Sequence, residues 1–261
     1  MKKVAKQRFG DCKEKSLLLV WLLKNIGIEK AYPALVNTHL ENELDAYLVS
    51  NQIFNHCIVT FEYNNETYWV DPTIAMQGGD FKDIYTYNYG KALVIGQPAD
   101  TLQTISITNK KGITNYIDEL KFKSFTDPGQ LVIRSKRSGF EADTRRYLME
   151  YYSVNDVAEK LSNVLKKQFP IVTKTDEVKI DDDMDTNTFT MTYRYDVDEI
   201  WQNGDNINPP VYGYWIFRFE PLTVYDYLSN TVCEERKFDY ALNYPENFNY
   251  RIVFDFPKDM L

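Results

Sequence analysis

Three residues in the first part of the chain have types that together could carry out nucleophilic catalysis: Cys12, His56 and Asp71. Cys12 directly follows Asp11, a residue suited to a helix N-cap, and precedes seven consecutive apolar residues, Leu17 to Leu23. Unpaired N–H groups and aligned peptide dipoles at a helix N-terminus favour a thiolate over a thiol. Cys12 is therefore a candidate nucleophile, although a free cysteine more often only packs in a core.

His56 and Asp71 lie at the two ends of the clearest β-hairpin pattern in the sequence, "HCIVTFEYNNETYWVDPT" (56–73). Alternation of side chains and the pair Asn64-Asn65 predict two antiparallel strands joined by a two-residue turn. Counting back from that turn places His56 and Asp71 diagonally on the same face, with Cα atoms about 7–8 Å apart. A three-residue turn would instead place them on opposite faces.

The chemistry of this pair follows from the residue types. A carboxylate that accepts one imidazole N–H fixes the tautomer and leaves the other ring nitrogen free to take a proton from a thiol. Each residue alone has an ordinary explanation: His56 as a packed histidine at a strand end, and Asp71 as a turn residue before Pro72. With Cys12 they complete a nucleophile, a base and an orienting group.

Composition limits the other classes of function. The 261-residue chain has a net charge of −8 and a pI near 5.0, which argues against a nucleic-acid or anionic-membrane partner. Its cysteines, Cys12, Cys57 and Cys233, are odd in number and widely spaced, so neither a disulfide framework nor a metal site is predicted. The acidic run "DDDMD" (181–185) lacks the glycine and glutamate of an EF-hand loop and is expected to be a solvated loop. No cofactor is expected.

The apolar run is too short to span a membrane, which takes roughly 20 residues, so no membrane insertion is expected. No hydrophobic segment follows the starting Met-Lys-Lys, so the sequence predicts no signal peptide and a cytoplasmic protein. A truncated N-terminus would leave a periplasmic or exported location open.

The expected fold is α+β in two domains, 1–99 and 100–261. In the first, a helix over 12–26, ending before Gly27 and buried on most sides, packs on an antiparallel sheet. Pro33 suggests that the strand at 31–36 lies near an edge. The remaining expected elements of this domain are a loop or helical turn at 39–52, the hairpin, a strand at 91–96 and a polar boundary segment at 96–103.

The second domain is expected to be β-rich and sandwich-like, with a helical insertion at 141–169 broken near Ser153. Its abundant aromatic residues are typical of strands. The strands are expected at 103–108, 117–124, 130–136, 187–195, 211–219 and 249–256.

Several segments resemble the bacterial transglutaminase-like proteins of the papain-like cysteine superfamily. They are "GDCKEKSLLLVWLLKNIGIEKAYPALVNT", "FNHCIVTF" and "YWVDPT", in the order Cys, His, Asp, followed by "KALVIG". Looser matches to the β-rich domain that follows this core are "GFEADTRRYL", "NTFTMTYRYDVDEIW" and the last strand, so the resemblance covers residues from about 8 to 257. It implies Cys12 as nucleophile, His56 as base and Asp71 as orienting carboxylate.

The resemblance implies acyl transfer on amide or peptide bonds of a protein or peptide substrate, as a peptidase, deamidase or transglutaminase. The alternative is a catalytically inactive binding or scaffold protein that retains the fold. Such cores usually carry helices before the cysteine motif, whereas 11 residues precede Cys12 here, so a truncated core is expected. The side-chain amide of Gln7 is a weak candidate for oxyanion binding.

Overall fold

The computed structural model describes residues 6–7, 9–48, 50–97, 101–107, 111–221 and 247–257. The chain divides into two compact units, Met1–Lys110 and Lys111–Leu261, each described here by itself. The division lies beyond the expected boundary at residue 99. The reason is that β5 (Gln103–Thr104) pairs with β4 (Lys91–Val94) in the first sheet, and the next residue, Ile105, is buried in the first core.

The first unit opens with α2 (Cys12–Asn25), whose two ends are fixed by local hydrogen bonds. Asp11 is the N-cap and forms a capping box with Glu14, in which each side chain bonds the other's backbone N–H. At the other end, Gly27 has a φ of 94° and Ile28 N donates to Leu23 O at 3.0 Å, a Schellman-type termination. The helix start predicted at Cys12 is confirmed.

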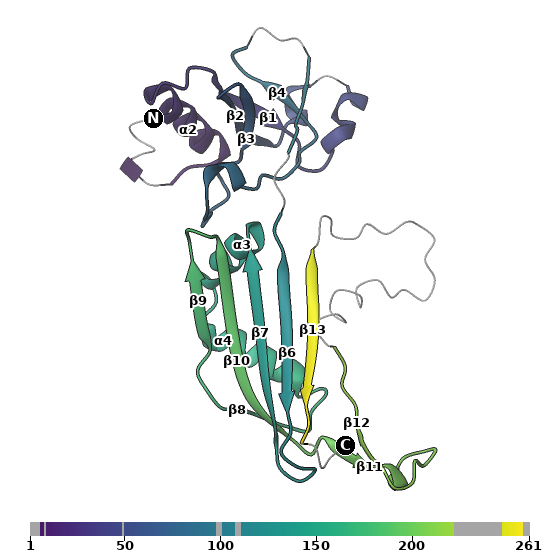
Figure 1. Ribbon diagram of the computed structural model, residues 1–261. Coiled ribbons are helices and arrows are strands. Elements are labelled where there is room, and N and C mark those ends of the chain that lie inside the picture. The colour runs from purple at the N-terminus through teal and green to yellow at the C-terminus, as the bar shows by residue number, and fades with distance from the viewer. Residues whose placement is uncertain are drawn as a thin grey trace. The chain divides into compact units, whose positions relative to one another are not determined.

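Within the described residues the first sheet has the order β3-β2-β1-β4-β5, and every neighbouring pair is antiparallel (Figure 1). Short 3-10 helices, η1 (Glu41–Ala46), η2 (Asn51–Ile53) and η3 (Phe81–Asp83), lie in its connections. The other strands are β1 (Ala31–Val36), β2 (His56–Tyr63) and β3 (Glu66–Val70).

The expected edge position of β1 is wrong, because β1 lies at the centre of the sheet between β2 and β4. Pro33 is tolerated there because it lies where the ladder with β4 ends. Ile95 N donates to Pro33 O at 2.9 Å, and the last paired residue before it is Ala34 with Val94. The reciprocal bond would need an N–H that proline lacks, so pairing stops at this point.

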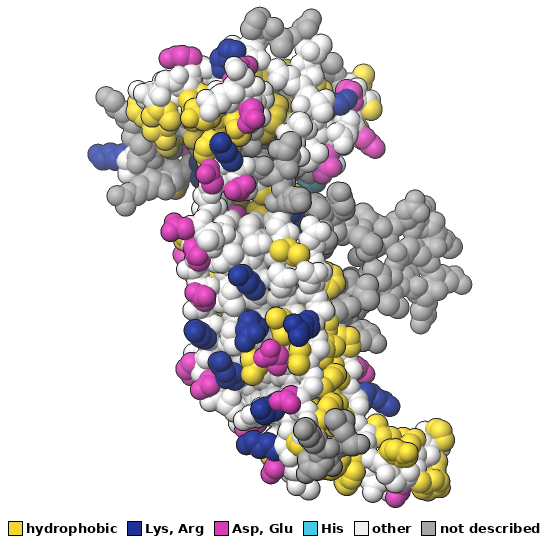
Figure 2. Space-filling view, viewed as in Figure 1, with side chains coloured by type: hydrophobic (Ala, Val, Ile, Leu, Met, Phe, Trp, Pro, Cys, Tyr) yellow, Lys and Arg dark blue, Asp and Glu magenta, His cyan; other side chains and the backbone are white. Residues whose placement is uncertain are grey.

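α2 packs on one face of the first sheet. Leu23 of the helix and Ala31, Val59 and Phe61 of the strands form a buried cluster. The expectation that α2 is buried on most sides is wrong, because Trp21 is 47% exposed and its neighbours on the outer face are also exposed. Figure 2 shows hydrophobic side chains on the surface in the region of α2. The exposed apolar residues of the helix and its C-cap are Leu17, Trp21, Leu22 and Ile26.

The second unit is built on one large sheet with a helical layer on one face (Figure 1). In the described residues its order is β13-β6-β7-β10-β8, with β9 also paired to β10, and β13 is parallel to β6. α3 (Phe140–Met149) and α4 (Val154–Leu165) pack against the sheet through Ala142, Ala158 and Leu165. The strands are β6 (Thr114–Lys121), β7 (Gly129–Ser138), β8 (Ile171–Lys174), β9 (Lys179–Asp183), β10 (Thr188–Asp198) and β13 (Phe248–Asp255).

This architecture corrects two expectations for the second unit. It is β-rich and carries the expected helical insertion, but helices, rather than a second large sheet, cover the main sheet; a separate ribbon pairs β11 (Trp201–Asn203) with β12 (Trp215–Phe217). Much of the acidic run expected as a loop belongs to β9, whose side chains are exposed and whose backbone pairs with β10. None of the helices described has the length and apolar character needed to cross a bilayer.

Candidate active site

The hairpin of β2 and β3 brings His56 and Asp71 together. Tyr63 pairs with Glu66 across a two-residue turn, and Asn64 and Asn65 have φ values of 52° and 64°. This is the left-handed conformation that asparagine tolerates. The predicted register is confirmed. His56 Nε2 lies 2.7 Å from Asp71 Oδ2, so the two side chains form a hydrogen bond on the same face.

Asp71 is 2% exposed and has all the hydrogen bonds that an ionised carboxylate needs. Thr73 donates to Oδ1 from its backbone N at 2.9 Å and from its hydroxyl at 2.6 Å. Oδ2 accepts from the Tyr89 hydroxyl at 2.8 Å in addition to His56. Burial by itself raises the pKa of Asp71, but the hydrogen bonds from His56, Thr73 and Tyr89 outweigh it and lower that pKa. Asp71 is therefore held as a buried anion.

The ionised Asp71 determines the tautomer of His56. A carboxylate can only accept, so Nε2 of His56 carries the proton and donates it. In a neutral ring Nδ1 is then an acceptor, which is the state that a general base requires. The imidazole also packs edge-on against the Tyr89 ring, with centroids 5.6 Å apart, and its side chain is 14% exposed. The ring is held by two contacts but retains access to solvent.

The position of Cys12 follows from how α2 packs along β2. Ser16 Oγ donates to Cys57 O at 2.8 Å, and Leu23 packs with Val59 further along the strand. Helix and strand therefore run in the same direction, and one turn before Ser16, about 5.4 Å along the axis, places Cys12 beside the start of β2. Cys12 is therefore on the same side of the sheet as Cys57, whose backbone oxygen accepts from Ser16 one turn further along the helix. His56 is the residue before Cys57.

α2 does not lie on the face that carries His56 and Asp71. It covers the opposite face, with Val59 and Phe61, whereas Ile58 and Trp69 of the His56 face belong to a separate cluster. The expectation that the helix aims Cys12 directly at the His56–Asp71 face is therefore wrong. The thiol and the imidazole can meet only around the end of the sheet where β2 begins. In the described residues no hydrogen bond joins Cys12 to His56.

The other cysteines differ from Cys12. Cys57 is 3% exposed, and burial is the main cause that raises the pKa of its thiol. Cys12 is half-buried and is not in a disulfide. Cys233 lies outside the described residues. Among the cysteines described, Cys12 is thus the one that a reagent or substrate could reach.

Two partners of the site were not identified from the sequence. Thr73 follows Asp71 in an Asx-type turn, a pattern that "DPT" could have indicated. Tyr89 comes from the segment before β4, 18 positions from Asp71, and no local pattern points to it. Gln7, the weak candidate for oxyanion binding, instead donates its side-chain amide to Phe9 O at 2.7 Å.

The described residues contain no cluster of three or more His, Cys, Asp or Glu side chains that could hold a metal ion. The side chains of the site itself offer a thiol, an imidazole and a carboxylate. No protein-family model, curated protein or solved structure matches the chain.

Proposed function

We propose that this protein is a cysteine acyl-transfer enzyme of transglutaminase-like type, acting on amide or peptide bonds through Cys12, His56 and Asp71. The observation that supports it is the 2.7 Å hydrogen bond between His56 Nε2 and the buried anion Asp71, beside the helix that begins at Cys12. A histidine oriented by a buried carboxylate is the base that a nearby nucleophilic cysteine requires.

In the proposed reaction, Nδ1 of His56 takes the proton of the Cys12 thiol. The thiolate sulfur then attacks the carbonyl carbon of the substrate, and the negative charge moves to the carbonyl oxygen. As the C–N bond breaks, His56 gives its proton to the leaving amine, and a thioester remains on Cys12. Water or a second amine then attacks the thioester carbonyl carbon, and His56 accepts the proton of that attacking group. The C–S bond breaks, the acid or new amide is released, and the Cys12 sulfur takes the proton back from His56.

Backbone N–H groups can stabilise the oxyanion in this scheme. Asp11 accepts from Glu14 N, and the earlier N–H groups of the first turn point out of the helix end beside Cys12. Donors at a helix N-terminus are suited to a developing negative charge. For catalysis the Cys12 thiol and the His56 imidazole must come within hydrogen-bond distance of each other. Catalytic hydrogen bonds of this kind are often long until substrate binds.

Site-resolved alkylation tests the proposal. Iodoacetamide labelling of the folded protein, followed by mass spectrometry across a pH series, is expected to modify Cys12 at neutral pH and to leave Cys57 unmodified. His56→Gln and Asp71→Asn should slow labelling of Cys12, whereas His39→Gln should not, because His39 is exposed and outside the site. Reaction of Cys12 only above about pH 8, as for an ordinary thiol, would refute the proposal.

Product analysis would then identify the acceptor. A glutamine-containing peptide with a fluorescent primary amine distinguishes the three reactions. Amine incorporation indicates a transglutaminase, ammonia release without incorporation indicates a deamidase, and a new N-terminus indicates a peptidase. Cys12→Ser is the matched inactive control.

A binding or scaffold protein is the second candidate, and the exposed outer face of α2 favours it. Trp21 and Leu22 are each 47% exposed on that face, and exposed apolar patches often mark interaction sites. Equal and slow labelling of Cys12 in the wild type and in His56→Gln would favour this candidate over the enzyme.

A further inference from the structure

The inner face of the second sheet, beneath α3 and α4, changes from apolar to polar along its strands. On β7, Leu131 and Ile133 are followed by Ser135 and Arg137 on the same face, and all four are buried. Tyr116 of β6 pairs with Ser135 and is therefore on this face too. Buried polar groups at core positions under helices are unusual unless they have a function.

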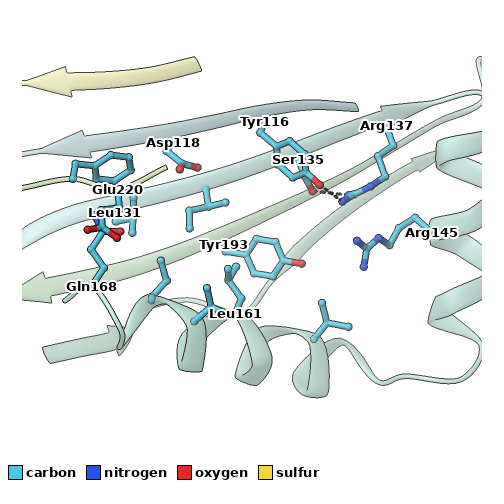
Figure 3. A pocket seen from close by; sticks show the side chains of 15 residues that line it. Tyr116, Asp118, Leu131, Ser135, Arg137, Arg145, Leu161, Gln168, Tyr193 and Glu220 are labelled. Atoms are coloured by element: carbon cyan, nitrogen blue, oxygen red, sulfur yellow. Dashed lines mark hydrogen bonds between the residues drawn. The ribbon is translucent and has the colours of Figure 1, made fainter. Parts of the chain in front are cut away.

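A cavity of about 240 Å³ lies between this polar region and α4 (Figure 3). Val157, Leu161 and Val164 of α4 form an apolar wall, and Leu131 and Ile133 line the sheet side. Pockets for drug-sized ligands have volumes of about 300–1,000 Å³. This cavity therefore suits a smaller molecule with an apolar part.

One end of the cavity carries a buried cation. Arg137 is 7% exposed, and it donates from Nη1 to Ser135 Oγ at 2.8 Å and from Nη2 to the Tyr116 hydroxyl at 3.0 Å. Both partners are neutral, and among the described residues no carboxylate lies within ion-pair distance of this guanidinium. A guanidinium has five N–H donors, and buried charges are normally paired with an opposite charge.

A second cation and a hydroxyl group lie at the same end. Figure 3 shows Arg145 of α3 and Tyr193 of β10 on the same side of the cavity as Arg137. Burial raises the pKa of Tyr193, and the charges of Arg145 and Arg137 both oppose that rise, so its hydroxyl lies near both. This end of the cavity is electropositive.

Two acids, Asp118 and Glu220, line the same cavity, and among the described residues no ion pair joins either of them to Arg137. Figure 3 shows Glu220 at the end of the cavity opposite Arg137. Burial raises the pKa of Asp118 to about 6, and only the hydrogen bond from the Tyr250 hydroxyl acts in the opposite direction. A guanidinium close to Asp118 would lower that pKa as well. Asp118 thus lies away from the cationic end, as Figure 3 shows.

We propose that this cavity binds a small amphipathic monocarboxylate. The carboxylate accepts from the N–H donors of Arg137 that Ser135 and Tyr116 do not use, because a guanidinium fork matches a carboxylate. The Tyr193 hydroxyl donates to Met191 Sδ at 3.3 Å, a weak acceptor, and turns to the carboxylate when the acid binds. The hydrocarbon part lies between Leu161 of α4 and Ile133 of β7. Inorganic phosphate fits less well, because away from this cationic end most of the cavity lining is apolar and would have no partner.

Isothermal titration calorimetry of the full chain with straight-chain acids from acetate to octanoate tests the proposal. At least one acid is expected to bind, and the alcohol and amine of the same chain length should bind at least about tenfold more weakly. Arg137→Gln should weaken binding of that acid by at least about tenfold. Arg134→Gln is the matched control, because Arg134 lies on the same strand but faces outward and is partly exposed, and it should leave binding unchanged.

A second variant separates loss of binding from loss of folding. Leu161→Phe fills the cavity without altering its charges, and it should abolish binding of the acid while circular dichroism shows an intact fold. If none of the acids binds, the proposal is overturned, and water then solvates the remaining N–H groups of Arg137. Equal binding of acid and alcohol, or equal losses in Arg137→Gln and Arg134→Gln, would also overturn it.

Discussion

Replacing Asp118 by asparagine should stabilise the second unit at neutral pH. The pKa of Asp118 is raised from its ordinary 3.8 to about 6, mainly by burial. The folded state therefore binds this proton more tightly than the unfolded state does, and stability falls as the pH rises from about 4 through about 6. At about 1.36 kcal/mol per pKa unit, the ionised carboxylate costs on the order of 3 kcal/mol at pH 7.

The asparagine side chain has nearly the same shape and cannot ionise. Its carbonyl oxygen can accept from the Tyr250 hydroxyl, as the carboxylate does, but its NH₂ group requires acceptors of its own. The free energy of unfolding at pH 7 is thus expected to increase by about 1–3 kcal/mol, the upper value being the whole ionisation cost. At pH 4 this gain should disappear, and the variant should be no more stable than the wild type.

Urea unfolding at pH 4 and pH 7, combined with hydrogen exchange of peptides from β6 and β7, measures this effect within the second unit. Glu119→Gln is the matched control, because Glu119 is the next residue on the strand and its side chain is 44% exposed. Glu119→Gln should change the free energy of unfolding by no more than about 0.5 kcal/mol. If the gain in Asp118→Asn is absent, or is the same at both pH values, ionisation of Asp118 is not a source of instability.

Three other substitutions test the packing. Ser16→Ala removes the donor to Cys57 O and should lower the free energy of unfolding by about 1–3 kcal/mol, measured by urea denaturation. Gly90→Ala should lower the melting temperature sharply, because φ is 71° and a Cβ would lie 2.3 Å from Glu41 C. Arg146→Leu leaves buried acceptors without their cation and should cost about 3–5 kcal/mol in the same denaturation assay.

The sequence predicted the hairpin and the His56–Asp71 pair because both depend on local rules. Strand alternation has a period of two, and the two asparagines select a turn of two residues, so the register follows by counting. Tyr89 could not be found this way. Its hydroxyl reaches Asp71 through the tertiary path of the segment before β4, and that path has no local signal.

Other differences between the predicted and the observed structure arise where strand pairing or tertiary packing, rather than local sequence, determines the structure. β9 has exposed acidic side chains and the composition of a loop, but its backbone pairs with β10. The apolar run of α2 predicted a buried helix, yet the sheet covers only one side of it. Composition shows which side chains avoid water, but not how many partners the fold supplies to cover them.

Asp71 and Asp118 show why burial of a carboxylate does not by itself determine its charge. Both are at least nine-tenths buried, and burial is the largest effect on each pKa. Asp71 accepts four hydrogen bonds, and its pKa is lowered. Asp118 accepts one from Tyr250 at Oδ2, and in the described residues its Oδ1 has no hydrogen-bond partner. The number of donors therefore decides the direction of the shift.

The two carboxylates must then affect stability in opposite directions as the pH changes. The lowered pKa of Asp71 contributes stability above the pKa of the unfolded chain, and this contribution is lost as the pH falls. The raised pKa of Asp118 stabilises the folded state at low pH, and that contribution is lost as the pH rises through about 6. A charge supported by four donors suits a residue that must orient His56. A carboxyl group with a single donor has no such support, so the folded chain favours its neutral form up to about pH 6.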